Sequence, residues 1–477
     1  MATYLHGSQT IEKNAINLTI QDADISNVCI IGTKPTYLLE ENNPIEKVVN
    51  FQETTKYIGN NIDGFTLPDA VETVLTESGG ASIYTINIFD TEKHLAQKQG
   101  AIAFSNGKCV LNELGIQNLK LTKEDFELEL NKDYSFENNI ISILVGGVLE
   151  NDSTGVNANY SYVDFTKITD SDVIGTTDEN GKRSGIQKIY DIIATYGVIP
   201  GIIIAPGFTS KNVRTAIETI AEKLEAFAYF DCDKNTTIPM AEKARLKEVD
   251  GVDLTTTSQR SDLCVPWVNR YNSYQNTTTL KPLSPVVAGL RVKLDRERNV
   301  AKSIDNTASK TIKSTQFPIS FMINDSTTDA NRLNAQGILT VINHKGEYYI
   351  WGGRNASFPS ETGLMTFESA RRTRDFINKS IRDTSFVCIG DNITQGFIDD
   401  VLNAINSAFA KWSNPANKNQ HIIYEGEAYW DESLNTAEDI ANGKIRFPYK
   451  CCPLATAENI EFHDILDISL ITKTLNS

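Results

Sequence analysis

Residues 201–231 read GIIIAPGFTSKNVRTAIETIAEKLEAFAYFD, and this stretch decides the fold. The apolar run Ile202–Ile204 is short and is closed by Pro206 and Gly207, as expected of a buried strand. Apolar residues then recur at 213, 216, 217, 220, 221 and 224, the spacing of one helix face. A second apolar run, 226–230, follows at once. This order predicts two parallel strands joined by a right-handed helical crossover.

The same α/β pattern occurs on both sides of this unit. Residues 28–31 are an apolar run that ends at Gly32 and predict a buried strand. Residues 67–89 predict a helix stopped by Gly79 and then a strand, and residues 186–194 place apolar side chains on one helix face. Between these segments, residues 93–166 alternate apolar and polar residues between Asn, Asp and Gly turns, which favours a small β-rich insertion.

The last third of the chain combines helices with extended segments. A hairpin is predicted over 337–353, and long helices over 366–382 and 394–412. Both chain ends show the two-residue period of a strand with one apolar face. The apolar positions of these end strands are Ile16, Leu18 and Ile20, and Ile460, Phe462, Leu466, Ile468 and Leu470. Neither end strand has an obvious sheet of its own.

Charge and composition exclude several partner classes. Lys and Arg total 45 against 61 Asp and Glu, a formal net charge of −16, which disfavours direct binding to nucleic acid or to an anionic membrane. No stretch reaches the roughly 18 apolar residues of a membrane-spanning helix. The start has no basic segment followed by an apolar one, so we expect a protein made and kept in the cytoplasm.

The motifs of common α/β enzymes are missing. Residues 175–184, GTTDENGKRS, miss a phosphate loop by one residue between the glycines and by Arg183 at the magnesium-binding position. The five histidines are scattered. Asp231, at a strand end, is the best metal candidate among the acidic pairs, but capping of backbone groups is the favoured interpretation. We therefore expect no catalytic, cofactor-binding or metal-binding residues.

Basic residues cluster on one predicted helix. Arg371, Arg372 and Arg374 stand close together on an otherwise acidic chain. Two interpretations stay open, a solvated helix face and a surface that docks an acidic protein or a neighbouring subunit.

Several of these segments, in this order, resemble the tail sheath protein of contractile bacteriophages and related phage-tail-like particles. The likeness is carried by His6-Gly7 with Ile11-Glu12, Ala205-Pro206-Gly207, Lys223 to Ala228, Ser284 to Gly289 with Asp295 to Arg298, and Leu333 to Ile338 through Trp351-Gly352-Gly353-Arg354. The resemblance covers most of the chain.

The resemblance implies a multidomain protein that mixes α/β and α+β parts. Its expected divisions are an N-terminal extended arm (1–24), an α/β sheath core in two parts (25–92 and 167–365), the β-rich insertion (93–166), a C-terminal α+β domain facing an inner tube (366–458) and a C-terminal strand arm (459–477). In such proteins, arms from both chain ends join a sheet in neighbouring subunits.

The implied function is structural. Subunits would polymerise as hexameric rings stacked in a helical sheath, and contract to drive an inner tail tube through a cell envelope. Baseplate and tail terminator proteins would be further partners, with no cofactor, no direct nucleic-acid contact and no membrane insertion. The alternatives are a nucleotide-dependent soluble α/β enzyme and a structural protein of another assembly.

Overall fold

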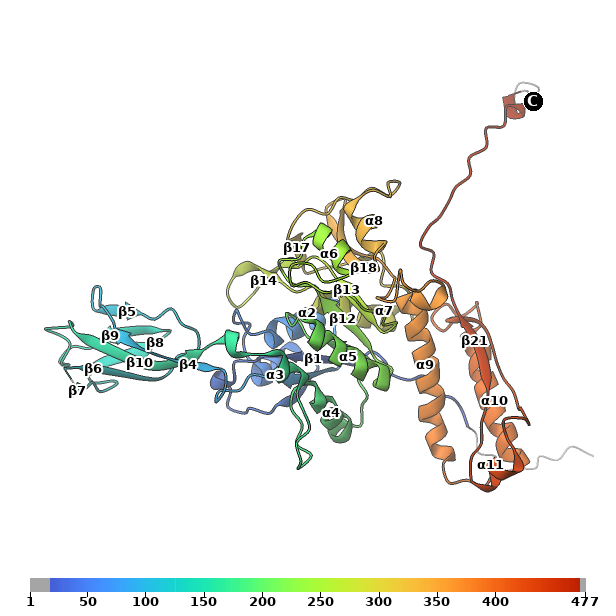
Figure 1. Cartoon of the computed structure of the whole chain (residues 1–477), viewed down its shortest axis with the longest axis horizontal. Helices are drawn as coiled ribbons and strands as arrows, with labels where there is room; N and C mark the ends of the chain where they lie inside the picture. The colour runs from blue at the N-terminus through green and yellow to red at the C-terminus, as the bar shows by residue number, and fades with distance from the viewer. Residues whose placement is uncertain (1–17, 125, 472–477) are drawn as a thin grey trace, which may run out of the picture.

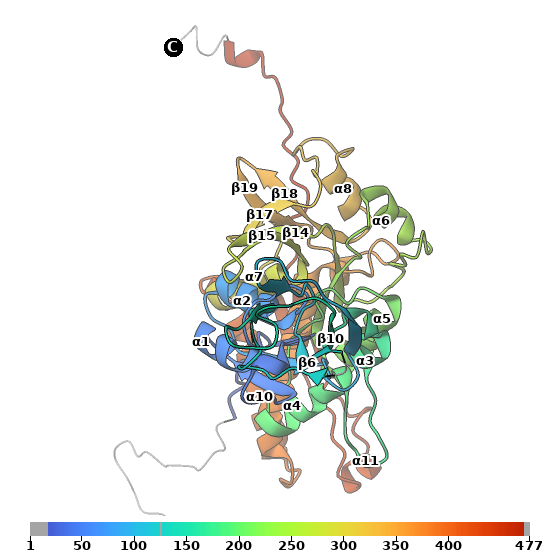
Figure 2. The ribbon, with the colours of Figure 1, turned by 90° about the vertical axis from the view of Figure 1, so that its left-hand side faces the viewer.

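A computed structural model describes residues 18–124 and 126–471. A β-rich body projects from one side of the central part of the molecule, and a pair of long helices stands at the opposite side (Figure 1). Viewed from the projecting side, the β-rich body lies in front of the core (Figure 2). Within the described residues, no helix combines the length and apolar character needed to cross a membrane.

The central part is built on one nine-stranded sheet with the order β16-β19-β18-β13-β12-β11-β1-β3-β2. Its strands are β1 (Val28–Gly32), β2 (Ile45–Val48), β3 (Ile83–Asn87), β11 (Ile202–Ile204), β12 (Phe227–Asp231), β13 (Ser261–Cys264), β16 (Thr307–Ala308), β18 (Ile338–His344) and β19 (Glu347–Trp351). The inner strands from β3 to β18 are parallel, and the outer pairings are antiparallel. The crossover predicted from residues 201–231 is therefore confirmed as β11, α5 (Lys211–Leu224) and β12.

Helices cover both faces of this sheet. In β1, Val28 and Ile30 point into the cluster that contains α2 (Leu67–Ser78) and α7 (Ser284–Glu297), and Cys29 and Ile31 point into the opposite cluster. That second face is covered by α4 (Ile189–Tyr196), α5, α6 (Ile238–Ala244) and α8 (Asp329–Asn334). The remaining short elements are α1 (Phe51–Glu53), α3 (Asp170–Ile174) and a three-stranded sheet of β14 (Val268–Asn272), β15 (Thr277–Lys281) and β17 (Ile312–Thr315). A single sheet covered by helices on both faces has strands that are buried on both sides, which explains their continuous apolar runs.

The β-rich body spans β4 to β10 and contains two small antiparallel sheets. One has the order β4-β10-β6-β7 and the other β5-β9-β8. The strands are β4 (Leu95–Ala101), β5 (Lys108–Val110), β6 (Gln117–Lys123), β7 (Phe126–Glu127), β8 (Tyr134–Glu137), β9 (Ile140–Ile143) and β10 (Val156–Val163). Leu121, Ile141 and Tyr160 belong to a hydrophobic cluster of its own.

The near miss for a phosphate loop is an exposed turn. Gly175 ends α3, Thr177 pairs with Arg183, and Ser184 precedes a short helical turn that begins at Gly185. The loop therefore has the conformation of a turn followed by a helix start, as its sequence indicates.

Asp231, at the end of β12, caps the start of helix α7. One carboxylate oxygen accepts the backbone N–H of Ser284 at 2.7 Å, and the other accepts the Ser284 hydroxyl at 2.5 Å. Both oxygens thus cap the start of α7, and no cluster of three or more metal-binding side chains occurs in the described part of the chain. Burial raises the pKa of Asp231 from 3.8 to about 6 in spite of these hydrogen bonds.

The pKa of Asp231 predicts a pH effect on stability. The folded carboxyl keeps its proton up to about pH 6 and the unfolded one only to 3.8, so ionisation of Asp231 disfavours folding more as the pH rises. Raising the pH from 5 to 7.5 should lower the free energy of unfolding of the wild type, relative to Asp231→Asn, by about 1 kcal/mol. Urea unfolding of both proteins at the two pH values measures this difference, and parallel pH profiles would contradict it.

Candidate assembly surface

The C-terminal part pairs two long helices with a two-stranded sheet. The helices are α9 (Glu368–Thr384) and α10 (Gln395–Trp412), and the strands are β20 (Ile423–Ala428) and β21 (Tyr449–Pro453), with the short α11 (Ala437–Ala441) between the strands. The strands are antiparallel and pack against α10. Gly426 allows this close packing, because a Cβ there would lie 2.7 Å from the Phe409 ring.

Both outer edges of this sheet lack a partner strand among the described residues. The edge of β20 is covered at one end, where the Asn406 side chain exchanges two hydrogen bonds with the backbone of Ala428. Unpaired edge groups are a template for an added strand. This sheet is thus a candidate acceptor for an extended segment of another chain.

The C-terminal arm, residues 459–471, leaves the body of the molecule and is exposed along its whole described length (Figure 1). Ile460, Phe462 and Leu466 are 67%, 91% and 87% exposed, and Ile468 and Leu470 are exposed too. The arm is extended to residue 467 and ends in a helical turn, so the strand predicted over 460–470 does not form in the single subunit. A strand requires a hydrogen-bonded neighbouring strand, and residues 459–467 have no such neighbour in the described part of the chain.

The N-terminal segment lies along the C-terminal helices instead of forming a strand. Ile16 is outside the described residues, and residues 18–27 have no strand. Ile20 is 5% exposed, packed in the cluster that joins α9, α10 and β20, with Leu18 partly buried beside it. The backbone N–H groups of Gln21 and Ala23, which a strand would use for pairing, donate instead to side-chain hydroxyls of α9.

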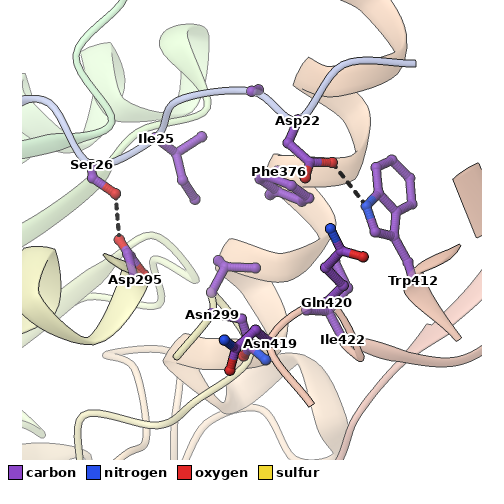
Figure 3. Close-up of a pocket in the computed structure, with 12 residues that line it drawn as sticks. Asp22, Ile25, Ser26, Asp295, Asn299, Phe376, Trp412, Asn419, Gln420 and Ile422 are labelled. Atoms are coloured by element: carbon purple, nitrogen blue, oxygen red, sulfur yellow. Dashed lines mark hydrogen bonds between the residues drawn. The ribbon is translucent and has the colours of Figure 1, made fainter. Parts of the chain in front are cut away.

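Figure 3 shows how this segment is fastened beside a cavity of about 200 Å³. Asp22 accepts hydrogen bonds from the Trp412 indole at 3.1 Å and from Lys411 at 2.7 Å. Ser26 donates to Asp295 at 3.0 Å. The segment therefore bridges the two C-terminal helices and the core helix α7.

A buried ionic network joins the core to the C-terminal helices. Arg372 on α9 forms two hydrogen bonds to Asp295 on α7, at 2.7 and 2.8 Å. Asp295 also pairs with Arg291, whose guanidinium lies 3.4 Å from Glu368. Glu368 accepts the hydroxyl of Tyr229 from β12 at 2.9 Å. All these side chains are almost fully inaccessible to water.

The prediction of one exposed basic surface at Arg371, Arg372 and Arg374 is therefore wrong in this structure. Arg371 is 9% exposed and pairs with Asp375, which Arg260 of the core also binds. Arg374 alone of the three is exposed. Helical spacing places Asp375 beside Arg371, but it could not reveal that Arg372 meets Asp295, 77 residues away in the sequence.

Electrostatics favour the charged forms inside the network. Burial raises the pKa of Asp295, but Arg291 and Arg372 outweigh it and hold that pKa below its ordinary value. Burial likewise opposes the charge of Arg372, yet Asp295 and Glu368 raise its pKa. Asp262, beside the network, has no such partner in the described residues, and burial together with Glu368 raises its pKa well above 3.8.

Removal of one member should expose the cost of the unpaired charge. We expect Arg372→Gln to lower the free energy of unfolding by about 3 kcal/mol, because Asp295 stays buried and keeps one of its two cationic partners, Arg291. The matched control on the same helix, Arg374→Gln, should change it by less than about 0.5 kcal/mol. Urea unfolding of the isolated subunits compares them, and equal effects would show that the network does not stabilise the domain contact.

Comparison with known proteins places this surface in context. No family model matches the chain. A tail sheath protein of Burkholderia phage BcepMu is 30% identical over 463 residues, which cover 94% of this chain and 94% of the relative. A tail sheath protein of Escherichia phage P2 is 28% identical over 294 residues, covering 61% and 69% of the two chains.

Solved structures share the fold at lower identity. The PVC sheath complex of an extracellular contractile injection system, in its contracted state, matches with a TM-score of 0.62 and 14% identity over 98% of this chain and 99% of that one. The helical sheath of the anti-feeding prophage in its contracted state matches with a TM-score of 0.56 and 14% identity, over 98% and 100%.

Proposed function

The chain belongs to the tail sheath proteins of contractile phage tails, and from this premise we propose that it polymerises as hexameric rings stacked around an inner tube. Contraction of the polymer drives the tube through a cell envelope. The observation that carries the proposal is the combination of an exposed arm with an apolar alternation and a small sheet whose edges have no partner strand among the described residues.

In this proposal the C-terminal arm of one subunit adds a strand to the β20–β21 sheet of a neighbour. Ile460, Phe462, Leu466 and Ile468 lie on one face of an extended chain and would become buried there. Backbone hydrogen bonds give such an added strand its affinity, and the apolar side chains fix its register. Residues 1–17, with Ile16, form the second tether.

The remaining partners follow from the same proposal. The C-terminal domain faces the inner tube, and baseplate and tail terminator proteins close the ends of the polymer. The subunit is made and assembled in the bacterial cytoplasm and acts in the tail, without direct contact to nucleic acid and without membrane insertion. The work of contraction comes from a metastable lattice that relaxes to better intersubunit contacts while the tethers hold.

Truncations test the tethers. Removal of residues 459–477, or of residues 1–17, should leave a folded subunit that forms no long cylinders in electron micrographs. The N-terminal deletion stops at residue 17 because Ile20 and Asp22 stabilise the subunit itself.

A matched full-length variant carries Phe462→Ser, which keeps the length of the arm and removes the most exposed apolar side chain of its described residues. We expect fewer and shorter cylinders from this variant. Normal cylinders from both truncations would contradict the proposal.

Arg374 remains the candidate for contact with an acidic tube or a neighbouring subunit. Arg374→Glu should weaken binding of the tube and make the remaining binding more sensitive to salt, since attraction would turn to repulsion. Co-sedimentation of sheath with tube between low and high ionic strength measures the effect. Unchanged binding would assign Arg374 to the solvated helix face.

A further inference from the structure

The root of the C-terminal arm, residues 454–458, contacts helix α9 and the core after it leaves β21. After β21 ends at Pro453, the hydroxyl of Thr456 lies 3.0 Å from that of Ser369, which is 1% exposed at the start of α9. Two residues later, Glu458 reaches Arg354 of the core. From residue 459 to 471 every residue is exposed. The chain therefore contacts α9 and the core through Thr456 and Glu458 before it enters solvent.

The contact of Glu458 with Arg354 is well oriented. The Arg354 Nε lies 3.0 and 3.1 Å from the two carboxylate oxygens, and a terminal nitrogen lies 2.5 Å from Oε2. The guanidinium also packs on the rings of Phe367 and Phe358, with its central carbon 3.9 and 4.7 Å from their centroids. Its other terminal nitrogen donates to Thr366 at 2.6 Å. Arg354 is thus preorganised, so less rotamer entropy is lost when Glu458 binds.

These contacts sit where the core passes into the C-terminal domain. Arg354 pairs through its backbone with Phe367, and the N–H of Glu368 at the start of α9 donates to the carbonyl of Gly353. The same junction contains the buried pair of Arg372 and Asp295. The two kinds of contact differ in accessibility, since Glu458 is 45% exposed and Arg372 is 2% exposed. Water can replace the partner of Glu458 at far lower cost than that of Arg372.

We propose that the Thr456–Ser369 and Glu458–Arg354 contacts form an arm latch, which sets the free length of the C-terminal tether and opens when neighbouring cores move during contraction. This inference rests on the proposed tether function of the arm. Opening of the latch moves the last fixed residue from 458 back to 455, whose backbone N–H donates to the Tyr424 hydroxyl. Three extended residues add about 10 Å of reach at about 3.4 Å per residue. Opening of the latch thus lengthens the free part of the arm while the arm stays bound to the neighbouring subunit.

A reversible disulfide across the latch tests whether contraction requires the latch to open. Ser369→Cys with Thr456→Cys places two thiols where the hydroxyls are 3.0 Å apart, and glutathione disulfide can oxidise them to a bond that dithiothreitol reduces. Oxidised cylinders should form and then contract at least fivefold less, by contracted fraction in electron micrographs after mild denaturant, and reduction should restore contraction. Ser369→Cys alone controls for oxidation of the native thiols.

The outcomes separate the two proposals. If wild-type chains form no cylinders, the tether proposal itself fails. If wild-type and locked cylinders contract to the same extent, the tether stands and the latch is overturned. If the locked protein assembles only after reduction, the latch is already open in the starting lattice, which also overturns the inference.

A second pair of variants needs no cross-link. Glu458→Gln removes the ionic contact with Arg354, whereas Glu461→Gln makes the same change three residues further along the exposed arm. Glu458→Gln cylinders should contract about two- to fivefold faster than the wild type, the range expected for one exposed ion pair. Glu461→Gln should match the wild type. Equal rates for the two variants would overturn the latch.

Discussion

The pairing of Arg372 with Asp295 inside the protein is the constraint on which the arrangement of the subunit depends. An isolated charge in this position would be strongly disfavoured, so the guanidinium and the carboxylate must stay together. Because Asp295 belongs to a core helix and Arg372 to α9, the pair fixes the C-terminal helices against the nine-stranded sheet. The N-terminal segment, the small sheet and the root of the arm are then placed relative to the core through α9.

The charged contacts of the subunit are of two kinds, which differ in their access to water. The pairs of Arg372 with Asp295 and of Arg260 with Asp375, between core and α9, are almost inaccessible to water and include several hydrogen bonds per charged group. Those at the arm and its root are partly hydrated and use single residues. A body that must keep its shape while its neighbours change position benefits from this difference, because solvent competes only for the second kind.

Local pattern was sufficient for most of the sheet and its helices. The residues of β11, α5 and β12 combine two short apolar runs with one helical period within thirty-one residues, and no partner from elsewhere is needed to recognise them. Asp295 and Arg372 are 77 residues apart, and nothing in either neighbourhood indicates that they meet. Ile20 has the same alternation as Ile460, yet one is buried against helices and the other is exposed. Alternation reports that one face is apolar and leaves open which surface will cover it.

The β-rich body enters and leaves the core through paired strands, since Leu95 at the start of β4 lies opposite Val163 at the end of β10. The two connections to the core are therefore neighbours in space, and Val163 is anchored there with Phe65 and Phe89. A body attached through such a stalk can be enlarged, exchanged or lost in evolution without any shift in the path of the core strands. The same property makes this position a natural site for displaying a foreign domain on the particle, one copy for every subunit.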